Sequence, residues 1–257
     1  MPGSPLRTLE PLSPRPLLID AGWQLALLGG VLALIIRALM PLTGLGWHGL
    51  SAALVAYGAI AAVVLAGLGQ HAPHRRFGPA NRMTLLRAAY TALLVGILAE
   101  GLRIGEAGRW VLAASGAAAL TLDGVDGWAA RRSGFASRFG ARFDMEIDTL
   151  FVLALSALVY RTGQAGAWVL TIGAMRYIFV VAGWLWPPLA APLPPSQRRK
   201  RVCVGVIIAM LVALAPPVGP MMGRWLCLGG LLLLAYSFAA DCLRLAARGR
   251  GDAPAPG

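Results

Sequence analysis

Acidic residues are scarce in this chain. Its 257 residues include 11 Asp and Glu against 23 Lys and Arg, so the formal net charge is +12. Charged residues make up only 13% of the chain, whereas hydrophobic residues make up 58% and the mean hydropathy is +0.68. These values exclude an ordinary soluble domain and are typical of a polytopic membrane protein.

Cysteine and histidine are also few. They are Cys203, Cys227, Cys242, His48, His71 and His74. The cysteines have no paired spacing and lie in apolar segments, which predicts buried free thiols and argues against a disulfide framework or a zinc site. The histidines lack the spacing of metal ligands, and we interpret them as loop residues.

Eight apolar stretches are long enough, or nearly so, to cross a hydrocarbon core of about 30 Å as helices that rise about 1.5 Å per residue. Their approximate bounds are 21–41, 49–69, 83–102, 109–130, 141–161, 164–187, 201–217 and 222–245. The sequence therefore predicts an all-α polytopic membrane protein with about eight transmembrane helices.

The segments outside these stretches have their own character. Residues 1–20 contain five prolines, which should prevent a stable helix, while Glu10 and Asp20 argue against a secretory signal. We expect residues 1–20 to be a cytoplasmic tail and residues 70–82 an interfacial connector. Residues 246–257 are expected to be a disordered tail.

The basic residues indicate an orientation rather than a nucleic-acid partner. Of the 23 Lys and Arg, sixteen fall in the segments that are cytoplasmic if the N-terminus is inside, five fall on the other side, and Arg87 and Arg176 lie within spans. By the positive-inside rule both termini should be cytoplasmic. Charge scattered between apolar segments in this way argues against nucleic-acid binding.

The acids that do occur are concentrated. Five of the eleven lie between residues 123 and 148, and four of these are aspartates in two pairs. The spacing of Asp123 from Asp126, and of Asp144 from Asp148, places each pair on one helix face. Acids in an apolar setting need cations as partners, and four carboxylates without nearby Cys or His favour Mg²⁺ or Mn²⁺ over zinc. The pattern therefore predicts a divalent-metal site suited to phosphate chemistry.

Small and basic residues accompany the aspartates. Gly127, Ala130 and Gly140 would let a bulky ligand approach the backbone and the metal, and Arg131 and Arg138 could neutralise remaining phosphate charge. The alternative is that the aspartates form structural salt bridges with nearby arginines. That alternative does not explain the fixed order of glycine, alanine and arginine.

The segment reads Asp123-x2-Asp126-Gly127-x2-Ala130-Arg131-x8-Gly140-x3-Asp144-x3-Asp148. It resembles the signature of the CDP-alcohol phosphatidyltransferases at every defined position. A second match, Asn81-x2-Thr84-x2-Arg87, is similar to a segment that this family carries before its motif helix. The resemblance implies that residues 83–245 form the six-helix core of the family, with residues 21–69 as two additional N-terminal spans.

The resemblance also implies a reaction and its residues. A CDP-alcohol, typically CDP-diacylglycerol, would transfer its phosphatidyl group to a small alcohol and release CMP. Two metal ions would be held by Asp123, Asp126 and Asp144, with Asp148 completing the site and acting as general base. The CDP site would be formed by Thr84, Gly127, Ala130, Arg131 and Gly140. We expect a homodimer in a bacterial inner membrane, with the active site at the cytoplasmic face.

The acceptor alcohol is less well defined by the sequence. Arg176 lies deep in a predicted span, where an arginine should face a cavity or a partner rather than lipid. Together with Arg142, Arg198 and Arg199 it could bind an anionic acceptor such as glycerol 3-phosphate or an inositol phosphate. The alternatives are pairing of Arg176 with an acid and, for the basic run Arg198–Arg201, an orientation signal or contact with lipid headgroups. The residues after Asp144 lack the Pro and Lys associated with many phosphatidylglycerophosphate-forming members.

Two other functional classes use intramembrane acids. A membrane prenyltransferase also binds magnesium diphosphate through aspartates, but its motifs usually lie far apart in the sequence. A cation transporter would place its acids near the midplane in broken helices, whereas these flank a cytoplasmic turn. Metal-dependent release of CMP would separate the transferase from both.

Overall fold

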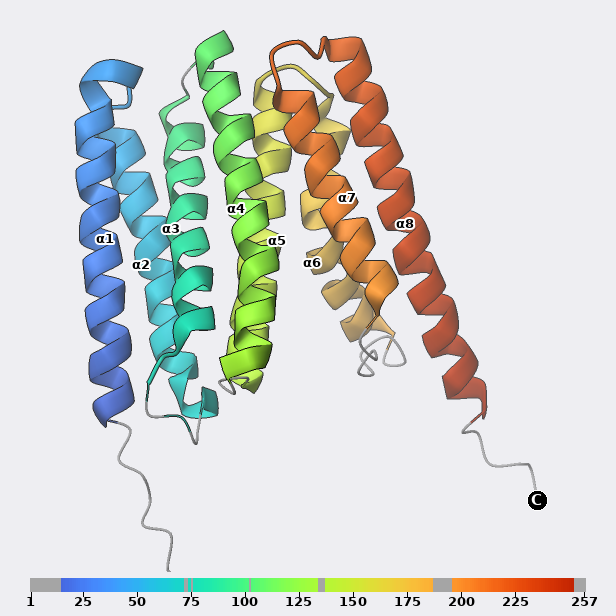
Figure 1. Cartoon of the computed structure of the whole chain (residues 1–257). Coiled ribbons are helices and arrows are strands. Elements are labelled where there is room, and N and C mark those ends of the chain that lie inside the picture. Colours follow the sequence, from blue (N-terminus) through green and yellow to red (C-terminus); the bar gives the residue numbers. More distant parts are fainter. Residues whose placement is uncertain are drawn as a thin grey trace, which may run out of the picture.

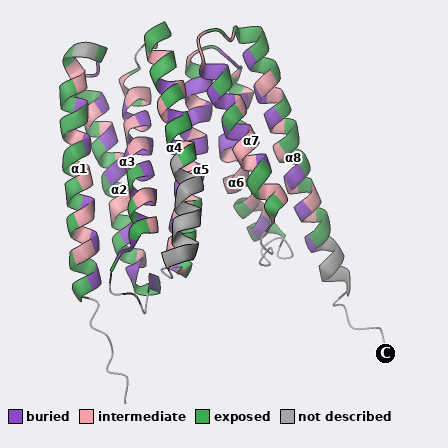
Figure 2. Cartoon of the chain, in the orientation of Figure 1, coloured by how far each residue is buried: buried purple, intermediate pink, exposed green. Residues whose placement is uncertain are grey.

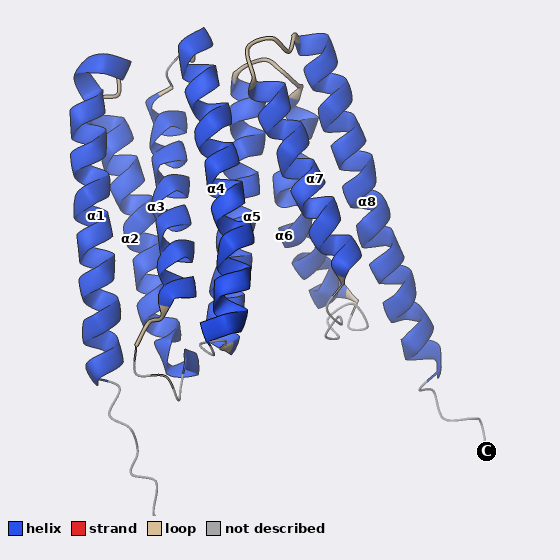
Figure 3. Ribbon diagram, in the orientation of Figure 1, coloured by secondary structure: helices blue, strands red, loops and turns tan. Residues whose placement is uncertain are grey.

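The computed structural model describes residues 15–71, 74, 76–101, 103–133, 137–186 and 196–251. For residues 15, 42, 122–133 and 246–251 only the backbone is described. These residues form eight α-helices and two short 3₁₀-helices, and no strand occurs among them (Figures 1 and 3). The α-helices are α1 (Arg15–Thr43), α2 (Trp47–Gly67), α3 (Pro79–Glu100), α4 (Glu106–Ser133), α5 (Arg138–Arg161), α6 (Leu170–Leu185), α7 (Gln197–Leu214) and α8 (Pro220–Gly251). The 3₁₀-helices are η1 (Leu68–His71) and η2 (Ala167–Val169).

The helices run alternately up and down in one bundle (Figure 1). Helices α1, α3, α5 and α7 begin at the lower end of the bundle as drawn, and α2, α4, α6 and α8 finish there. The first and last described residues therefore lie at the same end, as the distribution of basic residues predicts for the two termini. We call this the lower end.

The outer surface of the bundle is suited to lipid. Five helices in the described part of the chain are long and apolar enough to cross a membrane: α1, α2 with η1, α3, α6 with η2, and α8. Large apolar side chains such as Trp23, Val55, Trp184 and Leu232 are exposed, and exposed positions occur along the length of the helices, between buried ones (Figure 2). The predicted all-α polytopic class is confirmed.

The other three helices, α4, α5 and α7, contain the charged segments. Helix α5 has 24 residues, enough to span about 36 Å at the usual rise, but its first half carries Arg142, Asp144, Glu146 and Asp148. Helix α7 begins with the basic run Arg198–Arg201. Their apolar portions are shorter because these charges occupy their lower ends.

Two predicted boundaries were wrong. Helix α1 begins at Arg15, inside the segment expected to be a non-helical tail, because Pro16 falls in the first turn, where a missing N–H breaks no helical hydrogen bond. Helix α8 continues to Gly251, beyond the predicted end of the last span at residue 245. The start of α3 at Pro79 follows the same rule, since proline is favoured at the first helical position.

Glycine allows α2 to pack closely on α3. A Cβ atom at Gly96 would lie 2.6 Å from the carbonyl oxygen of Gly49 and 2.9 Å from the Cβ of Ala53. The Glu100 carboxylate at the end of α3 also accepts a hydrogen bond of 2.5 Å from the Gly49 N–H, in the first turn of α2. Small residues at helix crossings are the usual means of close approach in membranes.

We expect Gly96→Ala to destabilise the protein by about 1–3 kcal/mol, because the added methyl group has no space against the backbone of α2. Gly58→Ala on the same helix pair is the matched control, since a Cβ there meets nothing within 4 Å. Thermal unfolding of the purified protein in detergent measures both. Equal melting temperatures for the two variants would contradict the close α2–α3 crossing.

Candidate active site

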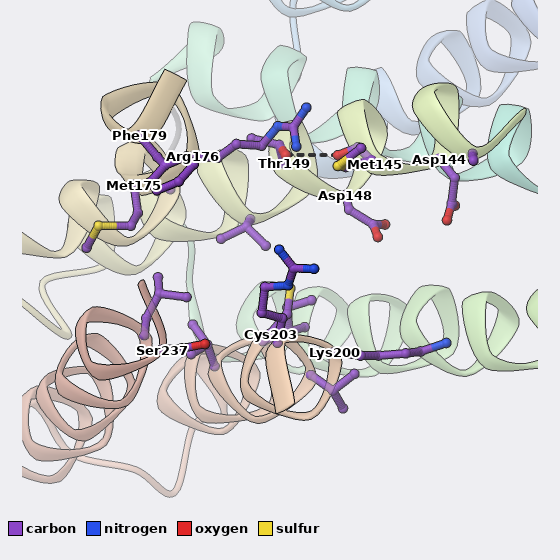
Figure 4. Close-up of a pocket in the computed structure, with 18 of the residues that line it drawn as sticks. Asp144, Met145, Asp148, Thr149, Met175, Arg176, Phe179, Lys200, Cys203 and Ser237 are labelled. Atoms are coloured by element: carbon purple, nitrogen blue, oxygen red, sulfur yellow. Dashed lines mark hydrogen bonds between the residues drawn. The ribbon is translucent and has the colours of Figure 1, made fainter. Parts of the chain in front are cut away.

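Two aspartates of the predicted motif lie one helical turn apart on α5. Ser137 caps this helix, and its hydroxyl oxygen accepts a hydrogen bond of 3.0 Å from the Gly140 N–H. Asp144 and Asp148 follow on one face and point into a cavity (Figure 4). Their side chains are 45% and 31% exposed, so both carboxylates are accessible from the cavity.

A buried arginine from α3 binds both carboxylates. Arg87 is 4% exposed, and its Nη1 donates to Asp144 Oδ1 at 3.1 Å while its Nη2 donates to Asp148 Oδ1. The planar guanidinium can contact two acceptors at once, and a buried cation requires such partners. Arg87 therefore fixes the face of α5 that carries the aspartates against α3.

The close approach of α3 and α5 also depends on a glycine. A Cβ at Gly140 would lie 2.8 Å from Asn81 Oδ1. Asn81 is buried, and its amide donates to the Phe77 carbonyl at 2.5 Å. Thr84, one turn later on α3, is buried and lines the cavity. Gly140 and Thr84, expected to shape the nucleotide site, are thus brought together with Asp144 and Asp148.

The cavity has a volume of about 1080 Å³ and is lined by residues of α3, α5, α6, α7 and α8, together with Leu120 of α4 and two residues just before helices. Asp144 and Asp148 lie on one wall, and Lys200 and Cys203 of α7 lie on the opposite wall (Figure 4). Arg199 and Asp241 also line it. The cavity lining therefore carries charges of both signs, and its basic side chains are of the type that binds phosphate groups.

The four arginines predicted to bind an acceptor are placed differently. Arg176 and Arg199 line the cavity, whereas Arg142 is exposed and, like Arg198, does not line it. Arg176 Nη2 donates to Glu146 Oε1 at 2.5 Å, so the alternative of pairing with an acid also holds for this residue. Arg198 donates to Asp241 Oδ1 at 2.5 Å and to the Ser237 carbonyl at 3.1 Å.

The first half of the aspartate motif falls in α4, whose helical backbone is described as far as Ser133. The side chains of Asp123, Asp126, Ala130 and Arg131, like the surroundings of Gly127, lie outside the described part of the structure. Among the described side chains no group of three or more His, Cys, Asp or Glu gathers as a metal site. The described carboxylates, Asp144 and Asp148, fit one side of a Mg²⁺ site, because oxygen donors are the ligands this ion prefers.

Three charged residues that line the cavity were not among the predicted site residues: Arg87, Asp241 and Lys200. Each had a signal in the sequence. Arg87 and Asp241 are charged residues within apolar spans, which implies a partner or a cavity. Lys200 belongs to the basic run that opens α7, but the sequence could not show which of its members turn inward.

The family model described as CDP-alcohol phosphatidyltransferase matches residues 77–236, which is more than half of the chain and includes α3 to α7 with the first part of α8. No solved structure matches the chain.

We expect Arg87→Gln to lower the stability by about 1–3 kcal/mol, because Asp144 and Asp148 lose their shared cation. This is less than the roughly 3–5 kcal/mol of a fully buried pair, since both carboxylates are partly exposed. Arg82→Gln is the control, because Arg82 lies on the same helix but is exposed and bound to Gln24. Thermal unfolding without divalent metal measures the difference, and equal loss in both variants would contradict the role of Arg87.

Proposed function

Because this chain belongs to the CDP-alcohol phosphatidyltransferase family, we propose that it transfers the phosphatidyl group of CDP-diacylglycerol to a small anionic alcohol. The family is one of phosphotransferases that act on CDP-alcohols in phospholipid synthesis, and its membrane setting agrees with the apolar helices of this chain. The family match gives no support to the prenyltransferase or the cation transporter. The choice of donor and acceptor is part of the proposal.

The observation that carries the proposal is the pair Asp144 and Asp148, held by Arg87 on one wall of a large cavity. In the transfer, the acceptor oxygen forms a bond to the phosphorus that bears the diacylglycerol oxygen, while the bond from that phosphorus to the CMP oxygen breaks. Asp148 accepts the proton of the acceptor hydroxyl, since an alcohol is a weak nucleophile near neutral pH.

The same residues support a divalent metal cofactor. Asp144 and Asp148, with Asp123 and Asp126 of the motif, would hold one or two Mg²⁺ or Mn²⁺ ions. When bound, these ions would neutralise the diphosphate of the donor and stabilise the charge on the departing CMP. Arg87 keeps the two α5 carboxylates oriented toward the cavity.

The position of the cavity is consistent with a lipid donor and a soluble acceptor. Most of the charged residues that line it, including Asp144 and Arg199, come from the lower parts of their helices, which we propose to be the cytoplasmic side, whereas Arg176 lies nearer the middle of α6. Val180 and Trp184 of α6 line the cavity and are also 42% and 78% exposed. This apolar side would allow the acyl chains to remain in the bilayer while the diphosphate reaches the aspartates.

We propose that the acceptor carries an anionic group. Arg176, Arg199 and Lys200 line the cavity across from or beside the aspartates, and the side chain of Arg176 is 27% exposed. An arginine so placed can donate to a phosphate oxygen in addition to Glu146. Glycerol 3-phosphate and an inositol phosphate are the first acceptors to test. Serine, which carries no phosphate group, is the comparison.

The central test is CMP release from CDP-diacylglycerol by the purified protein with Mg²⁺ and a panel of acceptors. Asp148→Asn should lower the rate by at least about 100-fold, because the general base is lost. Glu106→Gln, at an exposed position at the opposite end of the bundle, should retain full rate. Chelation of divalent metal should abolish release, and added Mg²⁺ should restore it. Normal turnover by Asp148→Asn would refute its assignment.

The acceptor assignment predicts a selective effect on the Michaelis constant. Arg176→Ala and Arg199→Ala should each raise the KM for the anionic acceptor about tenfold or more, with a smaller change in the KM for CDP-diacylglycerol. Arg201→Ala is the control from the same basic run, since Arg201 is exposed and does not line the cavity. An unchanged acceptor KM in both cavity variants would exclude these arginines from acceptor binding.

A further inference from the structure

A histidine at the end of the segment formed by α1, α2 and η1 contacts the residue that caps α5. His71 ends η1, directly after α2, and is fully buried rather than being the loop residue predicted from the sequence. Its ring contacts Phe139 of α5 edge-on at 5.6 Å between ring centres. A buried imidazole needs partners for both nitrogens, and both are present.

The partners of His71 define its tautomer. Nε2 lies 3.0 Å from the carbonyl oxygen of Arg76, which can only accept, so Nε2 carries the proton in the neutral ring. Nδ1, 2.7 Å from the Ser137 hydroxyl oxygen, is then the acceptor, and Ser137 donates to it. The oxygen of Ser137 still accepts the Gly140 N–H at 3.0 Å. The result is one continuous chain of hydrogen bonds from Gly140 to Arg76.

This series of hydrogen bonds ends at Gly140, one of the residues that bring α3 and α5 together. Gly140 has no room for a Cβ against Asn81, so the first turn of α5 can dock on α3 only in a narrow range of positions. The cap at Ser137 sets that turn, and His71 sets the orientation of the Ser137 hydroxyl. Asp144 and Asp148 follow on the same rigid helix.

Helix α1 also contacts the segment between η1 and α3. Asp20 of α1 accepts the Phe77 N–H at 2.8 Å, and Phe77 is fully buried and provides the carbonyl that binds Asn81. The additional helices therefore contact both the start of α3 and, through His71, the start of α5.

We propose that His71 is a positioning residue for the transfer reaction. By accepting a hydrogen bond from Ser137 it fixes the first turn of α5 against α3, and so makes the α1–α2 pair part of the active-site scaffold. The kinetic tests of this role rest on the proposed transferase function, whereas the hydrogen-exchange test does not.

The test compares two isosteric replacements in the full chain. His71→Asn retains an amide oxygen near the position of Nδ1, whereas His71→Gln reaches the position of Nε2 and can bind Arg76 only. We expect His71→Gln to lower kcat about tenfold or more and His71→Asn to lower it by less than about threefold, with similar melting temperatures. A role in packing alone would affect both variants alike, so equal kcat values would overturn the proposal.

A double-mutant cycle checks that the effect passes through the cap. Ser137→Ala alone should lower kcat about as much as His71→Gln, and the double variant should be no worse than either single variant. Losses that multiply would mean that the two residues act independently, which would overturn the proposal.

Hydrogen exchange provides a readout that does not need turnover. His71→Gln should increase exchange at the amides of the first turn of α5, including Gly140, while His71→Asn should leave them protected. If the wild-type protein releases no CMP with any acceptor, the proposed function fails, yet this comparison still tests the positioning role. Equal protection in both variants would refute it.

Discussion

A charge inside an apolar bundle needs a partner, and this requirement organises the site. Arg87 is almost fully buried, so its guanidinium must be neutralised, and Asp144 and Asp148 of α5 provide two carboxylates that do so. That pairing fixes how the two helices face each other. Because both aspartates are only partly buried, the same contact also leaves carboxylate surface toward the cavity, where a phosphorylated substrate can be bound.

The two halves of α5 belong to two different cores. Phe139, Phe143 and Ile147 pack with α1, α2 and α3, whereas Phe151 and Leu155 pack with residues of α4, α6, α7 and α8. The aspartates lie along the first half, so the additional N-terminal helices support the part of α5 that carries the chemistry. Helix α2 also packs closely on α3 through Gly49 and Gly96, so the N-terminal helices do not stand apart as a separate anchor.

Much of the fold and part of the site could be predicted from the sequence. The all-α membrane class, the family and the shared face of Asp144 and Asp148 are confirmed, because hydropathy and helical spacing are local properties. The helix start at Arg15 differs from the prediction, because a proline in the first turn of a helix breaks no helical hydrogen bond. The placement of Arg142 away from the cavity and of Lys200 inside it could not be deduced, because adjacent members of a charged run point to different sides of a helix.

The amino-acid sequence specifies the residue types that could perform the reaction: four aspartates in two helical pairs, with glycines beside them and a surplus of arginine. The packing of the helices settled which charges meet, joining Arg87 to Asp144 and Asp148, Arg176 to Glu146, and Arg198 to Asp241. It also decided that His71, from outside the matched family segment, contacts the cap of α5. Spacing along a chain fixes the face of a helix, but the neighbour of that face depends on how helices distant in sequence pack together.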